Sequence, residues 1–169
     1  PSFLRDEIGK RARHERLPSL SSALPSASEM RASYASGGLS AKRISSGASH
    51  EHQEKDAAGD LCVEETLCIA HAQLAWPVLG SLLEHCKQAL GLAGRWLVNA
   101  YVSADGRGFG WHFDAQHVFV LQVEGAKHWR YGTTPSTLDP RENCVLEGLD
   151  AFRERHPHSR VETPFDVPC

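Results

Sequence analysis

The chain has 169 residues and a formal net charge of −3 with neutral histidines, a length sufficient for one domain with its own core. This charge excludes the strongly basic surface typical of general nucleic-acid binding. No run approaches the roughly 20 apolar residues of a membrane helix, and the charged first residues are unlike a secretory signal peptide. We therefore expect a soluble intracellular protein without membrane contact, in the cytoplasm first, with nucleus or organelle left open.

The cysteines indicate a reducing compartment. There are 5 of them, an odd number, and no C-x-x-C pair occurs. A disulfide framework or a zinc ribbon is therefore not expected, and we interpret the cysteines as thiols.

Three segments of different character follow one another along the chain. Residues 1–16 are charged and predict a short helix or the stub of one. Residues 17–60 are dominated by Ser, Ala, Gly and charge, with few large apolar side chains. Such a composition buries too little surface to offset its ordering entropy, which predicts a disordered linker. Residues 61–169 regain apolar content and are expected to form a partial domain.

The first elements of that domain are a strand region and a helix. Residues 61–73 predict a strand pair or a strand with a short turn, and residues 74–91 predict a helix. Pro77 suits the first turn of this helix and Gly91 suits its C-terminal cap. Residues 95–103 predict a strand buried on both faces, because apolar side chains occur at both parities.

The centre of the sequence is the triplet His112-Phe113-Asp114. In an extended strand, residues two apart point the same way. His112 and Asp114 would then present an imidazole nitrogen and a carboxylate oxygen to one point, with Phe113 on the other face. Two ligands of a 2-His-1-carboxylate iron site are supplied in this way.

The residues after the triplet predict a hairpin. Val118–Leu121 reads as an apolar strand, Glu124-Gly125-Ala126 as a tight turn and Lys127–Tyr131 as a second strand. The turn would return Lys127 to the triplet, with Trp129 and Tyr131 on its face. A solvated strand lysine is the alternative. Further on, a loop with prolines precedes a short strand or loop and a helical turn around 149–155.

These residues together carry a resemblance to a known family. The run N-A-Y-x-S…G-F-G-W-H-F-D-x-x-x-V-F-V-L-Q-V-E-G-x-K-x-W resembles the core of the JmjC/cupin-like Fe(II)- and 2-oxoglutarate-dependent oxygenases. The branch that it resembles most is the ribosomal-oxygenase type. The ligand pair, the turn, the lysine and the tryptophan all match in spacing.

The resemblance implies a mainly β fold with helices (α+β), a double-stranded β-helix of the cupin or jelly-roll type. It implies Fe(II) bound by His112 and Asp114, and 2-oxoglutarate as co-substrate held by Lys127. Asn99 and Tyr101 would line the pocket. For Asn99, the alternative is a polar residue near a strand edge. No catalytic residue beyond the metal ligands is implied.

Two departures from the family pattern matter. The family's acidic residue before V-F-V-L-Q is His117 here, and no G-D-x-x-x-x-P-x-G-x-x-H segment supplies the second iron-binding histidine. We therefore expect a fragment whose fold is truncated in its C-terminal half and which does not turn over 2-oxoglutarate alone. His156 and His158, in a loop around Pro157, are not expected to replace the missing ligand.

The sequence is compatible with three classes of function. The main hypothesis is a hydroxylase acting on a protein side chain, for which the resemblance favours a ribosomal protein. A non-catalytic cupin-like binding module that has lost its iron site is the alternative, and a sugar-isomerase-type metal cupin is a third. No direct nucleic-acid binding is expected, and homodimerisation is left open.

Overall fold

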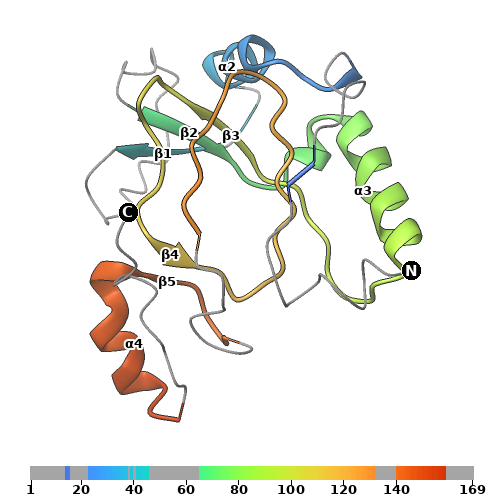
Figure 1. Cartoon of the computed structure of the whole chain (residues 1–169). Helices are drawn as coiled ribbons and strands as arrows, with labels where there is room; N and C mark the ends of the chain where they lie inside the picture. Colours follow the sequence, from blue (N-terminus) through green and yellow to red (C-terminus); the bar gives the residue numbers. More distant parts are fainter. Residues whose placement is uncertain are drawn as a thin grey trace. The chain divides into compact units, whose positions relative to one another are not determined.

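The computed structural model describes residues 14–15, 23–37, 39, 41–45, 65–131 and 140–158 (Figure 1). By its internal contacts the chain divides into two compact units. One unit is Leu17–Phe109, and the other joins Pro1–Arg16 to Gly110–Cys169. Of the charged helix expected over 1–16, only residues 14 and 15 are described, and both are exposed and non-helical.

The unit 17–109 is built on an antiparallel sheet whose order is β1-β2-β3, with β1 Lys42–Ser45, β2 Glu65–Ile69 and β3 Ala100–Ser103. β2 lies in the centre, pairing Arg43 with Leu67 on one side and Leu67 with Val102 on the other. Leu67 and Ile69 are almost fully buried, because a central strand of β-branched and aliphatic residues is covered on its apolar face. The strand expected within 61–73 is confirmed by β2.

β3 is shorter and less covered than expected. The predicted strand 95–103 contains regular pairing only over Ala100–Ser103. Ala100 and Val102 are buried, whereas Tyr101 between them is 44% exposed. The expectation of burial on both faces was therefore wrong. Tyr101 instead packs edge to face on Phe109, with ring centroids 5.3 Å apart.

Helix α3, Pro77–Leu90, confirms the predicted helix to within its first turn. Pro77 stands at the first helical positions, where a missing N–H costs no hydrogen bond. Gly91 ends the helix at φ 61°, a left-handed conformation that favours glycine. Before it, the 3₁₀ helix η2, Ala72–Leu74, is tied to the sheet region because the Ala72 N–H donates to the Val98 carbonyl at 2.8 Å.

Helix α2, Ala27–Ala35, lies inside the stretch expected to be a disordered linker. Its start is a capping box: the Glu29 N–H donates to the Ser26 hydroxyl at 3.2 Å, and the Ser26 N–H donates to the Glu29 carboxylate at 2.7 Å. Met30 and Tyr34 are buried. The linker prediction is thus corrected for α2 and for β1. Composition indicated disorder, but a local cap and two large apolar side chains form an element.

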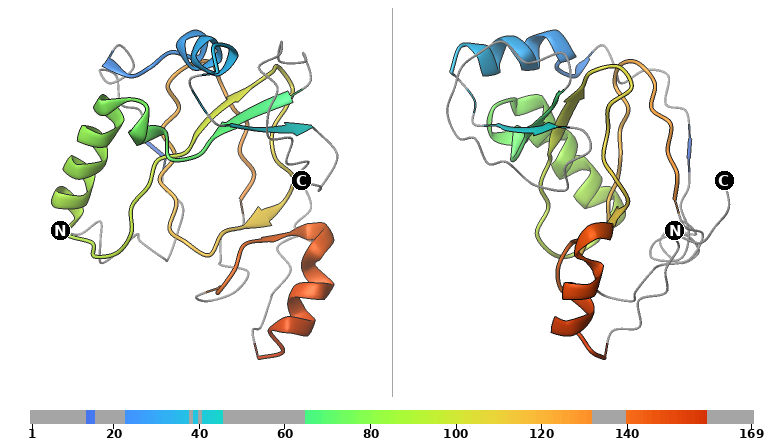
Figure 2. Two further views of the ribbon diagram at one scale, coloured as in Figure 1. Left: turned by 180° about the vertical axis from the view of Figure 1, so that it is seen from behind. Right: turned by 90° about the vertical axis from the view of Figure 1, so that its left-hand side faces the viewer.

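In the unit that contains residues 110–169, β4 His112–Phe113 pairs antiparallel with β5 Cys144–Val145. The 3₁₀ helix η3, Leu146–Gly148, then leads into α4, Leu149–Arg155. The two views of Figure 2 show α4 beside this strand pair. Phe113 packs against a buried cluster of Cys144, Leu149 and Phe152. The helical turn expected around 149–155 is confirmed.

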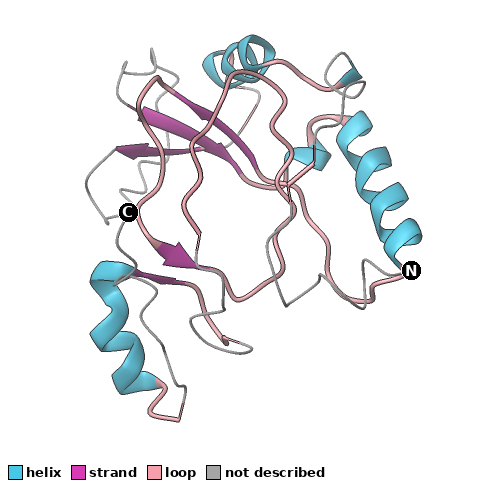
Figure 3. Cartoon of the chain, in the orientation of Figure 1, coloured by secondary structure: helices cyan, strands magenta, loops and turns pink. Residues whose placement is uncertain are grey.

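The stretch 114–131 differs from the predicted hairpin. Gly125 adopts φ 66°, so the expected bend at 124–126 is present. The flanking residues 117–123 and 126–131 contain no strand pairing and are drawn as loop in Figure 3. The predicted strands Val118–Leu121 and Lys127–Tyr131 were therefore wrong as strands. Apolar alternation indicates where a strand is favoured, but a strand also needs a hydrogen-bonding neighbour.

The fold is α+β at the coarse level, with helices and small antiparallel sheets. The described residues form one three-stranded and one two-stranded sheet. The double-stranded β-helix stays a prediction. Within the same described ranges, no helix is long and apolar enough to span a bilayer. Three cysteines lie there, namely Cys68, Cys86 and Cys144, and none of them forms a disulfide.

Candidate metal centre

The β4–β5 pairing orients the central triplet. His112 stands opposite Val145, and Phe113 stands opposite Cys144. Phe113 turns inward and meets Phe152 edge to face, with ring centroids 5.2 Å apart. Because strand side chains alternate, this inward placement of Phe113 sends the side chains on either side of it to the opposite face. The apolar contact therefore fixes the direction in which His112 points, and Asp114 follows directly after the end of β4.

The side chains of His112 and Asp114 approach each other. The Nε2 atom of His112 lies 4.0 Å from Oδ2 of Asp114, and these side chains are 38% and 27% exposed. The Nδ1 atom of His112 is 2.8 Å from the Gly110 carbonyl oxygen. A carbonyl can only accept, so Nδ1 carries the proton. In the neutral ring, Nε2 then presents its lone pair on the Asp114 side.

His112 and Asp114 offer a donor set that suits the metal that the resemblance implies. Two ligands at about 2.1 Å from one cation and at right angles are about 3 Å apart. The observed 4.0 Å must therefore close by about 1 Å, a change within reach of side-chain rotation. Imidazole and carboxylate suit Fe(II). The pair fits such an ion, although the described residues contain no group of three potential metal-binding side chains.

Lys127 lies just past the Gly125 bend and is partly buried. This desolvation lowers the pKa of its ammonium group from the usual 10.5, because burial disfavours the charged form. Three residues further on, the Arg130 guanidinium stands 5.3 Å from the centre of the Trp111 ring. The segment after the bend therefore approaches Trp111, the residue that precedes His112, whereas the return of Lys127 itself to the triplet stays a prediction.

The face expected around Lys127 is more open than predicted. Trp129 and Tyr131 are 56% and 62% exposed. Val118–Leu121 is also exposed, with values from 37% to 58%. Their large apolar side chains are therefore accessible, and the aromatic surroundings expected for Lys127 do not form a closed wall.

Asn99 and Tyr101 belong to the other unit and are placed there by their own contacts. The Asn99 side-chain oxygen accepts a hydrogen bond from the His71 N–H at 3.3 Å. His71 has φ 55°, a left-handed conformation that is uncommon for a residue with a side chain. This local role matches the alternative reading of Asn99 as a polar residue beside a strand. The pocket roles of Asn99 and Tyr101 stay predictions.

The sequence did not indicate the residues of the segment 143–146 that form hydrogen bonds with the residues flanking the triplet. The Asn143 side-chain oxygen accepts a hydrogen bond from the Ala115 N–H at 2.8 Å, across 28 positions of sequence. Leu146 N–H donates to the Trp111 carbonyl at 3.0 Å. No local pattern indicates these contacts, because they depend on which distant segment pairs with β4.

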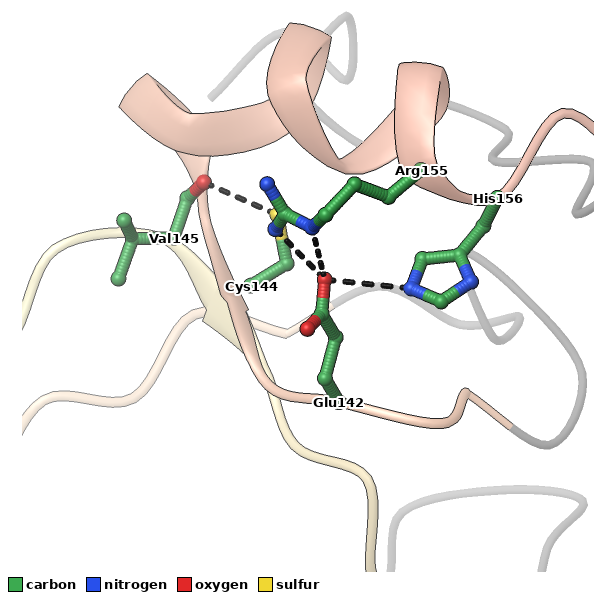
Figure 4. Close-up of polar contacts among 5 residues, drawn as sticks. All are labelled: Glu142, Cys144, Val145, Arg155 and His156. Carbon is green, nitrogen blue, oxygen red and sulfur yellow. Dashed lines mark hydrogen bonds and ion pairs between the residues drawn. The ribbon is translucent and has the colours of Figure 1, made fainter.

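Next to Asn143 lies a charged cluster, shown in Figure 4. The Arg155 guanidinium donates to one oxygen of Glu142 through Nε at 2.9 Å and Nη2 at 2.6 Å. His156 Nε2 lies 3.2 Å from the same oxygen. The hydrogen bond from Arg155 is the main cause that lowers the pKa of Glu142. Burial, followed by the charge of Glu142, raises the pKa of the Cys144 thiol and makes it a poor nucleophile.

Part of the chain matches a known family. Residues 81–161 match the model of the JmjC domain, and this range contains the triplet, Lys127 and Asn143. This part of the chain is therefore JmjC-like, in agreement with the resemblance seen in its motif.

Part of the chain is also similar to a named protein. The chain is 39% identical over 70 residues to a protein named Ribosomal oxygenase 1 from Gallus gallus, a match that covers 40% of this chain and 11% of the relative. The two matches agree that residues 81–161 are JmjC-like and that part of the chain is similar to a ribosomal oxygenase. The chain spans about a tenth of that relative's length. No solved structure matches the chain significantly.

Proposed function

We propose that this chain carries the metal- and co-substrate-binding part of an Fe(II)- and 2-oxoglutarate-dependent oxygenase. The observation that carries the proposal is the approach of His112 Nε2 to Asp114 Oδ2 at 4.0 Å, within the range that matches the JmjC domain. When bound, the metal and 2-oxoglutarate supply the oxidising chemistry, and the protein supplies orientation and charge.

Each residue of the proposed site has a distinct task. His112 offers Nε2 because the Gly110 carbonyl holds its other ring nitrogen. Asp114 offers a carboxylate oxygen and neutralises part of the cation's charge. Lys127 offers an ammonium group to the distal carboxylate of 2-oxoglutarate. Its lowered pKa supports this role, because an anion arriving there would restore favourable interactions that burial has removed.

The substrate class follows from the resemblance alone. A protein side chain, such as one on a ribosomal protein, is the substrate that we propose for hydroxylation, in line with the name of the relative. The exposed apolar and aromatic side chains near Lys127 suit a macromolecular partner better than a small closed pocket would.

The proposal is tested by binding first and by turnover second. Titration of Co(II), a spectroscopic substitute for Fe(II), into the full chain should give absorption bands that change when 2-oxoglutarate is added. Succinate formation with Fe(II) and ascorbate is then followed by mass spectrometry. Because the described residues supply only two of the three ligands of such a site, binding of metal and 2-oxoglutarate without succinate is the expected result for this chain. That result agrees with the proposed site and is shared with the non-catalytic binding module. Absence of metal binding at millimolar concentration would contradict the proposed site.

A further inference from the structure

The segment that follows Asp114 is held by a side chain from far along the sequence. Ala115 donates its backbone N–H to the Asn143 side-chain oxygen at 2.8 Å. β4 ends at Phe113, so no ladder pairing reaches Asp114. The Asn143 hydrogen bond therefore replaces the next step of the ladder at the position where the proposed carboxylate ligand lies.

Contacts with one distant segment therefore occur before the triplet, in its middle and after it. Before it, the Trp111 carbonyl accepts the Leu146 N–H at 3.0 Å. In the middle, Phe113 packs on Phe152 with ring centroids 5.2 Å apart. After it, Asn143 holds Ala115. All three contacts come from the segment formed by residues 143–152, so this segment fixes the backbone of the proposed ligand pair.

The residue that precedes Asn143 is tied to α4. Glu142 accepts two hydrogen bonds from the Arg155 guanidinium, at 2.9 and 2.6 Å, which anchors the bend before β5 to the last turn of α4. A guanidinium that donates twice restricts the direction of its acceptor more than a single bond does. The residue before Asn143 is therefore tied to the end of α4, and Asn143 follows it directly in the chain.

We propose that Asn143 is a positioning residue that sets the direction of Asp114 relative to His112 and thereby tunes metal affinity. The inference rests on the proposed metal-binding function of that pair. Groups that orient metal ligands typically contribute about tenfold to a hundredfold in affinity. Without the Asn143 acceptor, the backbone after Phe113 gains freedom, and the 4.0 Å separation between Nε2 and Oδ2 is no longer restrained on the Asp114 side.

The test compares three forms of the full chain: wild type, Asn143→Ala and Asn143→Asp. The alanine variant removes the acceptor, whereas the aspartate variant keeps an acceptor oxygen at the same distance from the backbone. Co(II) affinity is measured by absorption at low and high salt, since salt screens the added charge but not the hydrogen-bond geometry. Amide exchange at Ala115 and at Phe152 is measured by NMR on the metal-free chain.

In Asn143→Ala we expect faster exchange at Ala115, unchanged exchange at Phe152, and Co(II) affinity weaker by about tenfold or more. In Asn143→Asp we expect both properties to return toward wild type at high salt. Wild-type affinity in Asn143→Ala would overturn the inference and leave the metal site standing. Failure of the wild type to bind Co(II) would instead overturn the proposed function, and with it any positioning role. Faster amide exchange at both Ala115 and Phe152 would mean that Asn143→Ala loosens the whole unit. In that case Asn143→Asp is the deciding variant. If Asn143→Asp has wild-type amide exchange but still binds Co(II) more weakly at high salt, the inference is overturned.

Discussion

Phe113 and Phe152 meet edge to face with their ring centroids 5.2 Å apart, and this contact joins the proposed metal-ligand triplet to helix α4. Phe152 is fully buried at 0% exposure. Because Phe113 occupies the inward position of β4, the same contact directs the side chain of His112, its neighbour in the strand, to the opposite face. Packing and site geometry are therefore coupled in this unit.

Truncation of Phe152 should destabilise the β4–β5–α4 region strongly. We expect Phe152→Ala to lower the free energy of unfolding by about 3–5 kcal/mol, the usual cost of emptying a buried aromatic position. Phe152→Leu, which keeps most of the apolar volume, should cost less than about 1.5 kcal/mol. Urea denaturation followed by tryptophan fluorescence measures both values. Equal and small effects would mean that the cluster of Cys144, Leu149 and Phe152 does not support the unit.

The ion pair between Glu142 and Arg155 should make the stability depend on acidic pH. Arg155 lowers the pKa of Glu142 from 4.5, so the native state favours the carboxylate. The associated stability is present above 4.5 and is lost as pH falls through the lowered native value. We expect the Tm difference between wild type and Glu142→Gln to shrink with acidification. A difference that stays constant from pH 7 to pH 3 would argue against the ion pair.

Substitution of Asn99 distinguishes its local hydrogen bond to His71 from a role in the proposed co-substrate pocket. Its side-chain oxygen accepts the His71 N–H at 3.3 Å, and loss of such a bond typically costs about 0.5–1.5 kcal/mol. We expect Asn99→Ala to show this loss in urea denaturation and Asn99→Asp, which retains an acceptor, to be milder. An additional fall in 2-oxoglutarate affinity, measured on folded Asn99→Ala, would support the pocket role that the resemblance implies.

The elements predicted well from the sequence are those defined by local chemistry. Helix α3 has its proline at the start and a left-handed glycine at its end, and α4 has a short apolar repeat. Helix α2 was missed, although Ser26 and Glu29 form a capping-box pattern that a search for helix starts would have found. The low apolar content of residues 17–60 predicts disorder, whereas this local signal predicts a helix start.

What could not be predicted depends on contacts between distant residues. The same-face approach of His112 and Asp114 followed from spacing of two, and a distance of 4.0 Å between their polar atoms agrees with it. The pairing of β4 with β5 and the support from Asn143 require knowledge of which remote segment lies beside the triplet. Conversely, Val118–Leu121 has strand-forming residues, but no strand pairing occurs in that described stretch.

Substitution of Lys127 tests the proposal that this residue binds 2-oxoglutarate. We expect Lys127→Ala to weaken 2-oxoglutarate binding at least about tenfold, since it removes a charge-assisted bond to a carboxylate, while the fold is retained. Lys127→Arg should keep part of the affinity. Because the pKa of Lys127 is lowered from 10.5, affinity should fall as alkaline pH approaches that lowered value and the ammonium loses its proton. Affinity that is equal in wild type and Lys127→Ala would exclude this residue from the site.

The same lowered pKa has the opposite consequence for stability. The unfolded chain holds the Lys127 proton more tightly than the folded chain. Burial of the charged ammonium therefore lowers the free energy of unfolding, and this effect is fully present at pH values below the pKa of Lys127 in the folded chain. The penalty is relieved as pH rises through that value toward 10.5. The contribution of Lys127 is the difference in Tm between wild type and Lys127→Ala, which should change in this direction as pH rises toward 10.5.

The most direct test of the central claim is a Co(II) titration of the full chain in four forms: wild type, His112→Ala, Asp114→Ala and His117→Ala. His117 is an exposed histidine close to the triplet, and its removal controls for nonspecific binding to imidazole. We predict one bound ion in wild type and in His117→Ala, with affinity reduced at least about tenfold in each of the other two variants. Equal affinity in all four forms, or loss on removal of His117 alone, would contradict the proposed metal centre.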